Sequence, residues 1–152
     1  LAAVVAIIGD RSALAGLPAL WRLGWSSILL GITFLGAGYA LSSVAGRPSG
    51  AAGLAIALWV VMVVLYDLGL LAMVVADDGG RLTTEALPAL LLANPADAFR
   101  LFNLSASQAT AAASGLGAAA KTVSSMAALG SILIWPALAF GLALAAFRRL
   151  QP

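Results

Sequence analysis

Uncharged apolar runs long enough to cross a membrane dominate the chain. A membrane-spanning helix needs about 20 apolar residues, because each residue rises about 1.5 Å and the hydrocarbon layer is about 30 Å thick. Three segments meet this requirement, at residues 27–45, 54–76 and 126–147. A shorter apolar run at residues 1–8 is typical of the end of a further span. The pattern predicts an all-α fold, a polytopic bundle of transmembrane helices.

Composition supports this fold class. Of 152 residues, 62% are hydrophobic and 9% are charged, and the mean hydropathy is +1.06. Eight basic and six acidic side chains cannot cover the surface of a soluble domain, in which about 25% of residues are charged. The net charge of +2 does not indicate nucleic-acid binding. The chain has no Cys and no His, so we expect no catalytic site, metal site or cofactor of its own.

The distribution of basic residues predicts the orientation. Alternating spans place residues 9–25 and 77–121 on one side of the membrane, and residues 46–51 with the C-terminal tail on the other. The second side has Arg47 and two tail arginines close to helix ends, whereas five basic residues of the first side are spread among acids. The number of basic residues would make the first side cytoplasmic, but the density of basic residues near helix ends favours the second side. We therefore expect a cytoplasmic C-terminus. The chain opens inside an apolar run, so residues 1–152 are interpreted as the C-terminal half of one transmembrane domain.

Asp67 is the only Asp, Glu, Lys or Arg inside the three predicted spans. It lies about nine residues, or about 14 Å, from the end of its helix, where a charge costs about 2.5–3.5 kcal/mol. One interpretation is a polar group that lines a conduit or holds a partner helix. The other is a protonated or hydrogen-bonded carboxyl at a local helix break beside Gly69. Tyr66 and Asp67 are the candidate intramembrane functional residues under either interpretation.

Other features of the spans are assigned to packing. Gly38 is followed one turn later by a serine, and such small residues let helices approach closely. Met62 and Met73 are predicted to share a helix stripe with Tyr66. Packing is favoured over a Cu(I) path because three helical turns separate the sulfurs. Pro136 predicts a kink in the last span, which serves either as a hinge or only in packing.

The segment 77–121 is too patterned for a simple connector. Thr84 can cap a first short helix with about eight apolar residues, too few to cross the bilayer. Asn94 can cap a second helix, with Pro95 at its first position. The segment therefore predicts a short helical hairpin outside the spans, which dips partly into the membrane or lies on it.

Polar residues recur every three positions along the second helix. Asp97 near its start suits the positive end of the helix dipole, and Arg100 lies one turn later. Phe99 and Phe102 fall on the remaining faces. This pattern predicts a helix lying in the membrane interface, with an exposed Asp97–Arg100 pair of little energetic value.

The order of these elements resembles the C-terminal half of a type-2 ABC exporter-like permease. More narrowly, "LYDLGLLAMVVA" and "LPALLLANPADAFRLFNL", within residues 65–104, are similar to the NosY-type permeases. These are the membrane subunits of the ABC transporter that matures nitrous oxide reductase. The resemblance implies a homodimeric subunit of the bacterial cytoplasmic membrane that supports assembly of the reductase's copper-sulfur centres. It also implies a separate ATPase that binds ATP and Mg²⁺, and a periplasmic β-helix-like repeat protein as the outer partner.

The same resemblance implies roles for individual residues. Residues 46–51, with Arg47, would face the ATPase, and the hairpin would face the periplasmic partner. The candidate partner-binding residues are Asn94, Pro95, Asp97, Phe99, Arg100 and Phe102. No Walker-type glycine loop is present in the chain, in agreement with an ATPase on another polypeptide.

Three other functions stay open. The first alternative is a passive scaffold that anchors a periplasmic assembly factor. The second is the permease of another type-2 ABC transporter, and the third is a proton-coupled carrier that uses Asp67. An intramembrane hydrolase is disfavoured, because no suitable base accompanies the serines.

Overall fold

The computed structural model describes residues 11–45, 47–77, 86–105 and 123–148, and within these ranges every regular element is a helix. Within these ranges, three helices are long and apolar enough to cross a membrane, at Gly16–Val44, Pro48–Ala76 and Ser125–Arg148. Each of them contains one of the three predicted spans or most of it. The predicted span end at residues 1–8, the Thr84 cap, and residues 78–85 and 106–121 of the outer segment lie outside the described residues.

The first span begins earlier than predicted. Helix α2 covers Arg11–Val44, so the predicted connector at residues 9–25 is helical where it is described. Pro18 lies inside this helix, at the cost of one backbone hydrogen bond. Arg22 lies in the predicted connector, outside the membrane. In the structure it belongs to the long helix and bonds to other helices, as described below.

The middle span also begins earlier, at Pro48, immediately after the extended residue Arg47. Proline suits the first helical position, because the amide that it lacks has no intrahelical partner there. The middle span comprises α3 (Pro48–Val60), the π-helical turn η1 (Val61–Leu65) and α4 (Tyr66–Ala76). The connection to α2 is thus shorter than the predicted loop at residues 46–51.

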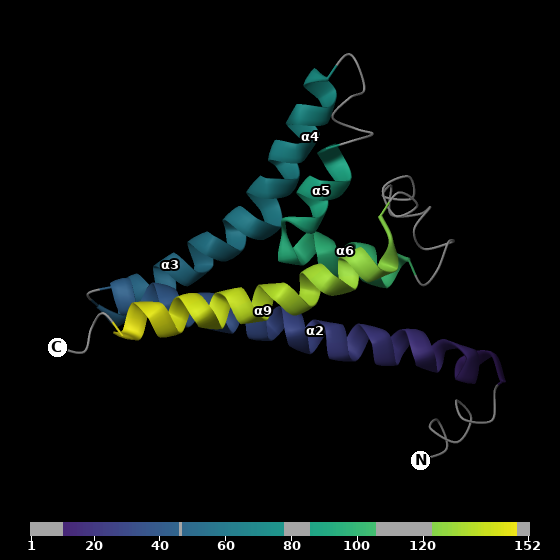
Figure 1. Cartoon of the computed structure of the whole chain (residues 1–152), viewed down its shortest axis with the longest axis horizontal. Helices are drawn as coiled ribbons and strands as arrows, with labels where there is room; N and C mark the ends of the chain where they lie inside the picture. Colours follow the sequence, from purple (N-terminus) through teal and green to yellow (C-terminus); the bar gives the residue numbers. More distant parts are fainter. Residues whose placement is uncertain (1–10, 46, 78–85, 106–122, 149–152) are drawn as a thin grey trace.

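Helices α2 and α9 (Ser125–Arg148) lie side by side along most of their length (Figure 1). Their close approach is at Gly36, where an added Cβ would lie 2.9 Å from the Phe140 ring and 3.1 Å from the Ala139 Cβ. Gly38, which the sequence pattern favoured as the packing glycine, has no such neighbour within 4 Å. Helix α9 continues through Pro136.

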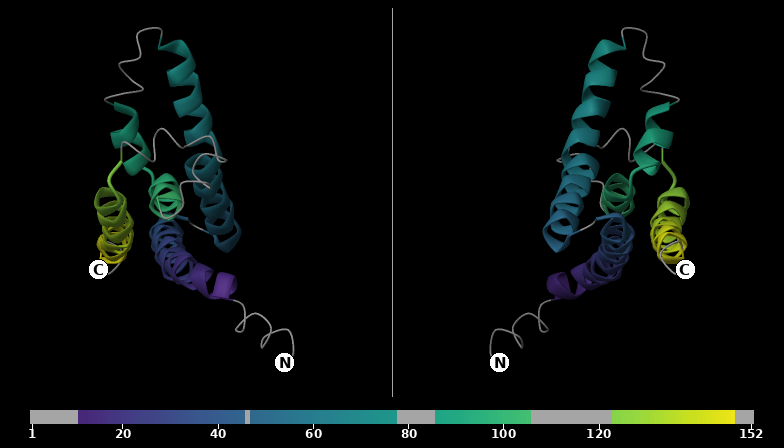
Figure 2. Two further views of the ribbon diagram at one scale, coloured as in Figure 1. Left: turned by 90° about the vertical axis from the view of Figure 1, so that its right-hand side faces the viewer. Right: turned by 90° about the vertical axis from the view of Figure 1, so that its left-hand side faces the viewer.

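The middle span diverges from the α2–α9 pair, and two short helices fill the angle between them (Figures 1 and 2). These are α5 (Leu87–Leu92) and α6 (Pro95–Leu104), which together form the predicted hairpin. Helix α6 packs against α9, α2, η1 and α5. It contributes Ala98, Leu101 and Phe102 to the main hydrophobic cluster.

The second short helix is packed within the described bundle, where its residue pattern predicted a helix lying in the membrane interface. Six of its ten residues are buried, whereas α3 and η1 contain no buried residue at all. Helix α6 packs its apolar positions against α2 and α9, and its polar side chains bond to other helices, although Arg100 stays about a third exposed. The hairpin is the centre of the described bundle rather than an appendage to it.

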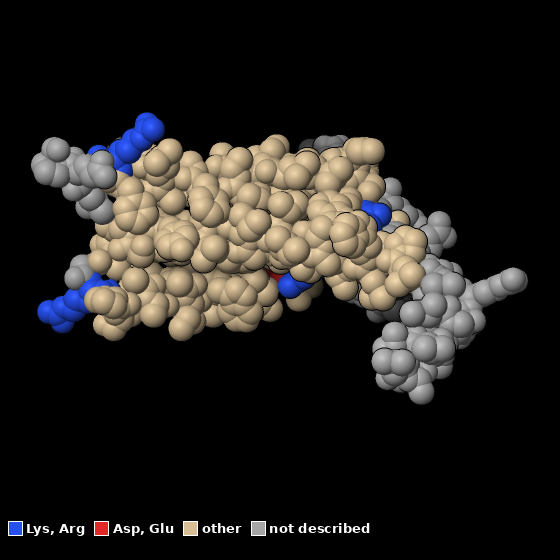
Figure 3. Space-filling model, turned by 90° about the horizontal axis from the view of Figure 1, so that it is seen from below, with Lys and Arg blue, Asp and Glu red and all other residues tan. Residues whose placement is uncertain are grey.

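Charged side chains are sparse on the face drawn in Figure 3, and basic side chains stand out at one end of the molecule. This is the end at which α3 follows Arg47 and α9 finishes with Arg148 in its last turn. Large apolar side chains of the middle span, such as Trp59, Leu68 and Leu71, are exposed along its length.

Candidate functional site

The site is built from the start of α6. The side-chain oxygen of Asn94 accepts a hydrogen bond from the Ala96 amide at 2.9 Å, and Pro95 occupies the first helical position. This confirms the predicted cap. The residue is fully buried, so the other end of its carboxamide also needs a partner within the protein.

That partner is the π turn of the middle span. Asn94 Nδ2 donates to the Met62 carbonyl at 2.6 Å. In η1 the Tyr66 amide bonds to the Val61 carbonyl, five residues back, so the hydrogen-bond register shifts there. Such turns are frequent at functional sites and expose carbonyls to outside donors. One carboxamide thus fixes the start of α6 and ties it to the irregular turn of the middle span.

A charged cluster of Asp67, Asp97 and Arg100 lies one turn further along. Arg100 Nη1 donates to Asp97 Oδ1 at 2.8 Å and also to Asp67 Oδ2 on α4. The side chains of Arg100 and Asp67 are about a third exposed, whereas that of Asp97 is 3% exposed. Both interpretations of Asp67 find a counterpart here, because its carboxyl bonds to a neighbouring helix and it also follows the irregular turn η1 directly. The Asp97–Arg100 pair is real, but it is buried on the Asp97 side rather than exposed.

The charged cluster contains two acids and one base. Burial and the nearby Asp67 carboxylate raise the pKa of Asp97 to about 7, against the opposing effect of Arg100. The second carboxyl oxygen of Asp97, Oδ2, is buried and has no hydrogen-bond partner among the described residues. Asp97 is therefore poised to hold a proton at physiological pH.

Arg22 holds the other end of α6. Its guanidinium donates to the Phe102 carbonyl and to the hydroxyls of Ser105 and Ser125, at 2.8 and 3.0 Å. It also lies over the Phe102 ring, 3.7 Å from the centroid, and Trp25 packs edge-on against the same ring. A cation suits this position because the carbonyl end of a helix is partially negative. Arg22 thereby joins α2, α6 and the start of α9.

Three further bonds connect the hairpin to the spans. Tyr66 Oη donates to the Leu90 carbonyl at 2.7 Å, and Ser131 Oγ on α9 donates to the Leu92 carbonyl at 2.6 Å. Asn103 Nδ2 donates to Ser26 Oγ on α2 at 3.0 Å. Polar side chains that bond between helices are the expected means of association in an apolar environment. The hairpin is thus tied to all three spans.

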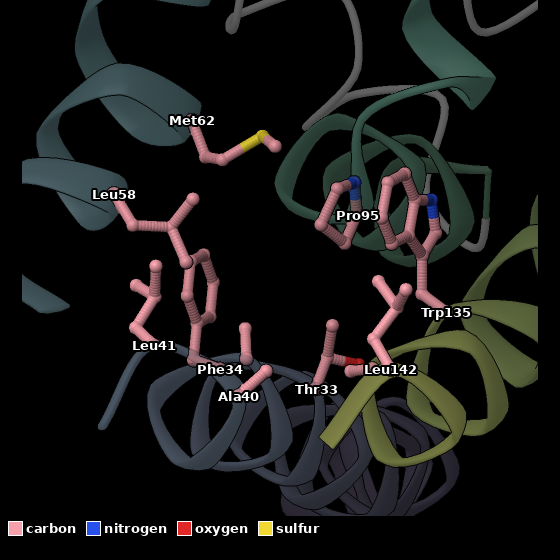
Figure 4. A pocket seen from close by; sticks show the side chains of 11 residues that line it. Thr33, Phe34, Ala40, Leu41, Leu58, Met62, Pro95, Trp135 and Leu142 are labelled. Carbon is pink, nitrogen blue, oxygen red and sulfur yellow. The ribbon is translucent and has the colours of Figure 1, made fainter. Parts of the chain in front are cut away.

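An apolar cavity of about 220 Å³ lies between α2, the middle span, α6 and α9 (Figure 4). Phe34, Met62 and Trp135 line it together with Pro95. Met73 lines a different cavity together with Tyr66. No group of three or more Asp or Glu side chains that could hold a metal occurs within the described ranges.

The structure places the candidate residues in two regions. Tyr66, Asp67 and the candidate residues of α6 lie together around the hairpin, whereas Arg47 lies at the basic end of the molecule. Among the candidates for partner binding, Asn94, Pro95, Asp97 and Phe102 are buried against this chain. Only Phe99 and Arg100 of that set keep part of their surface exposed. The buried side chains therefore position the hairpin, and partner contact is left to the other two.

Arg22, Ser26 and Ser131 were not predicted as site residues. Arg22 was assigned to a connector, although apolar residues flank it on both sides in "PALWRLGWSSILL". Extension of the first span toward the N-terminus would have made it an intramembrane charge, which requires a partner just as Asp67 does. The two serines carry no comparable signal.

Comparison with known proteins places this helix bundle in a family. The sequence profile described as ABC-2 family transporter protein matches residues 1–150. The chain belongs to the ABC-2 transporter family. Its members are membrane subunits of transporters, and the bundle of three apolar spans agrees with that assignment.

Two relatives narrow the similarity. The chain is 43% identical to a "Probable ABC transporter permease protein NosY" of Pseudomonas aeruginosa, over 97% of this chain and 54% of the relative. It is 42% identical to a protein of the same name from Stutzerimonas stutzeri, over 82% of this chain and 45% of that relative. These matches confirm the resemblance to NosY-type permeases. The chain spans about half the length of each of these relatives.

Proposed function

We propose that this ABC-2 family chain is the membrane-embedded part of a NosY-type permease that supports assembly of the copper-sulfur centres of nitrous oxide reductase. It would sit in the bacterial cytoplasmic membrane as one copy of a homodimer. An ATPase on a separate polypeptide would bind ATP and Mg²⁺, and a β-helix-like repeat protein would bind on the periplasmic side. The similarity to the two NosY permeases supports this proposal.

The proposed mechanism rests on the ion pair between Arg100 and Asp67. The middle span starts beside Arg47, at the basic end of the molecule, and the hairpin is attached to it by Asn94 and Arg100. A basic helix end is typical of the cytoplasmic side, where an ATPase would bind. A movement imposed near Arg47 would therefore reach the hairpin through one continuous helix. The exposed parts of Phe99 and Arg100 would pass it to the outer partner.

Copurification of the full-length protein tests the ATPase assignment. An ABC ATPase should copurify in mild detergent, and Arg47→Glu should reduce its yield severalfold. Arg148→Glu is the matched control, because it makes the same charge change at the same end of the molecule. A permease that is purified without an ATPase, or equal losses in both variants, would contradict the assignment.

A passive scaffold is the second candidate, because the hairpin is bonded to all three spans and would hold a docked outer partner in place without moving. Asp67→Asn distinguishes the two. It would leave an anchor intact, but it would break the tie that transmits movement. We expect Asp67→Asn to lower the copper content of nitrous oxide reductase in cells while the ATPase still copurifies. Normal copper content would favour the scaffold.

A further inference from the structure

The charged cluster has one more acid than base, and no other described cation compensates for it. Both carboxyl groups accept from one nitrogen, Arg100 Nη1. Arg22 is committed to the opposite end of α6. Helix α5 contains no titratable residue, α9 contains only Arg148 in its last turn, and the nearby Tyr66 hydroxyl donates to a carbonyl of α5.

Asp97 Oδ2 is the atom that this arrangement leaves unsatisfied. It is buried without a donor among the described side chains, and the Asp97 side chain is only 3% exposed. The Asp67 carboxyl is its neighbour, because both groups accept from the same nitrogen of Arg100. Two ionised carboxylates cannot donate to each other, so one of them must carry a proton for the two to be joined by a hydrogen bond. Neighbouring carboxyl groups raise the cost of ionising both, which favours a single shared proton.

We propose that Asp97 and Asp67 form a proton-binding site, in which Asp97 Oδ2 carries the proton and donates it in a hydrogen bond to the Asp67 carboxylate. Arg100 then bonds to Asp67 across the two helices. The burial that raises the pKa of Asp97 to about 7 agrees with this assignment. The proton sits on the hairpin rather than on the transmembrane acid that the sequence singles out.

Proton occupancy would set how firmly the hairpin is held. With the proton present, the cluster is neutral, and the Arg100 charge is available to Asp67 alone. Loss of the proton leaves a net negative charge in a half-buried site, and Asp97 then competes for the same nitrogen. The tie between α6 and α4 weakens as a result. The site would therefore make attachment of the hairpin sensitive to proton availability, whichever cargo or ATPase the permease uses.

Infrared spectroscopy of the full-length permease in lipid nanodiscs tests the proposal. We expect a carbonyl band of a protonated carboxylic acid that disappears with a midpoint at about pH 7. Asp97→Asn should abolish the band. Asp67→Asn should shift the midpoint to lower pH, because Arg100 then pairs with Asp97 alone. Asp77→Asn, at the end of the same middle span, is the control and should leave band and midpoint unchanged.

A band that persists in Asp97→Asn, or the lack of any titrating band in the wild type, would overturn the proposal. If Asp97→Asn does not fold, the Asp67→Asn midpoint decides, because an unchanged or higher midpoint also contradicts a shared proton. These readouts need neither an ATPase nor a reductase. A negative result would therefore leave the proposed transport function untouched, and the converse also holds.

Discussion

The carboxamide of Asn94 serves two helices with its two polar atoms. Its oxygen caps α6, and its nitrogen donates to the Met62 carbonyl in the π turn. An N-cap contributes about 1 kcal/mol, and a hydrogen bond between membrane helices about 0.6 kcal/mol on average. The two contributions are separable, because an aspartate retains the cap oxygen but has no donor.

We therefore expect Asn94→Asp to destabilise the full-length protein at least as much as Asn94→Ala. Asn94→Ala loses the cap and the donor, whereas Asn94→Asp keeps the cap but turns a carboxylate toward the Met62 carbonyl at a fully buried position. The loss should be about 1–3 kcal/mol, measured by thermal unfolding in detergent. Wild-type stability of Asn94→Asp would show that only the cap matters.

Asp97 predicts a specific dependence of stability on pH. Its pKa is raised from 3.8 to about 7 in the folded protein, so between these values the native state binds more protons than the unfolded state. The free energy of unfolding should therefore fall as pH rises through this window, and this contribution should be constant outside it. Urea titrations over this pH range should show the slope in the wild type and a reduced slope in Asp97→Asn. Equal slopes would contradict the raised pKa.

At the scale of the elements, the α2–α9 contact depends on one glycine. Gly36→Leu should force the two helices apart, because even a Cβ would lie 2.9 Å from the Phe140 ring. Gly38→Leu is a matched control two residues away with no neighbour within 4 Å, and it makes the same gain in helix propensity. We expect a melting temperature lower by several degrees for Gly36→Leu, and no loss for Gly38→Leu.

The tie between α4 and α6 can be tested by exchanging its charges. Asp67→Arg and Arg100→Asp should each destabilise the protein, because they leave like charges together. The double variant again has one guanidinium and two carboxyl groups, so it should recover part of the loss. A coupling of about 0.5–3 kcal/mol is expected from the double-mutant cycle. Strict additivity would mean that Arg100 and Asp67 do not interact.

For the whole molecule, the basic end predicts the orientation in the membrane. The sequence has no cysteine, so single cysteines can report which side each end occupies. Ser49→Cys lies at the exposed start of α3, and Ser124→Cys lies at the exposed position preceding α9. With other cysteines of the full-length protein replaced, an impermeant maleimide should label Ser124→Cys in intact spheroplasts. It should label Ser49→Cys only after the membrane is opened, and the reverse pattern would invert the proposed topology.

The sequence by itself determined the features that depend on neighbouring residues. The three spans follow from apolar length, and that property is local. The start of α6 was predictable because its cap joins Asn94 to Ala96, two residues away. The family resemblance was likewise carried by one continuous stretch, residues 65–104.

The tertiary structure decided how these pieces meet. Asp97, Arg100 and Asn103 have the spacing of a stripe on a helix surface. Two distant residues turn this stripe toward other helices: Arg100 bonds to Asp67, 33 residues away, and Asn103 bonds to Ser26, 77 residues away. Met62 and Met73 came to line different cavities, and the close packing of Phe140 falls on Gly36 instead of Gly38. A polar side chain is equally satisfied by water or by a distant helix. Its periodicity therefore cannot show which one it meets, and this was decided when the hairpin packed among the three spans.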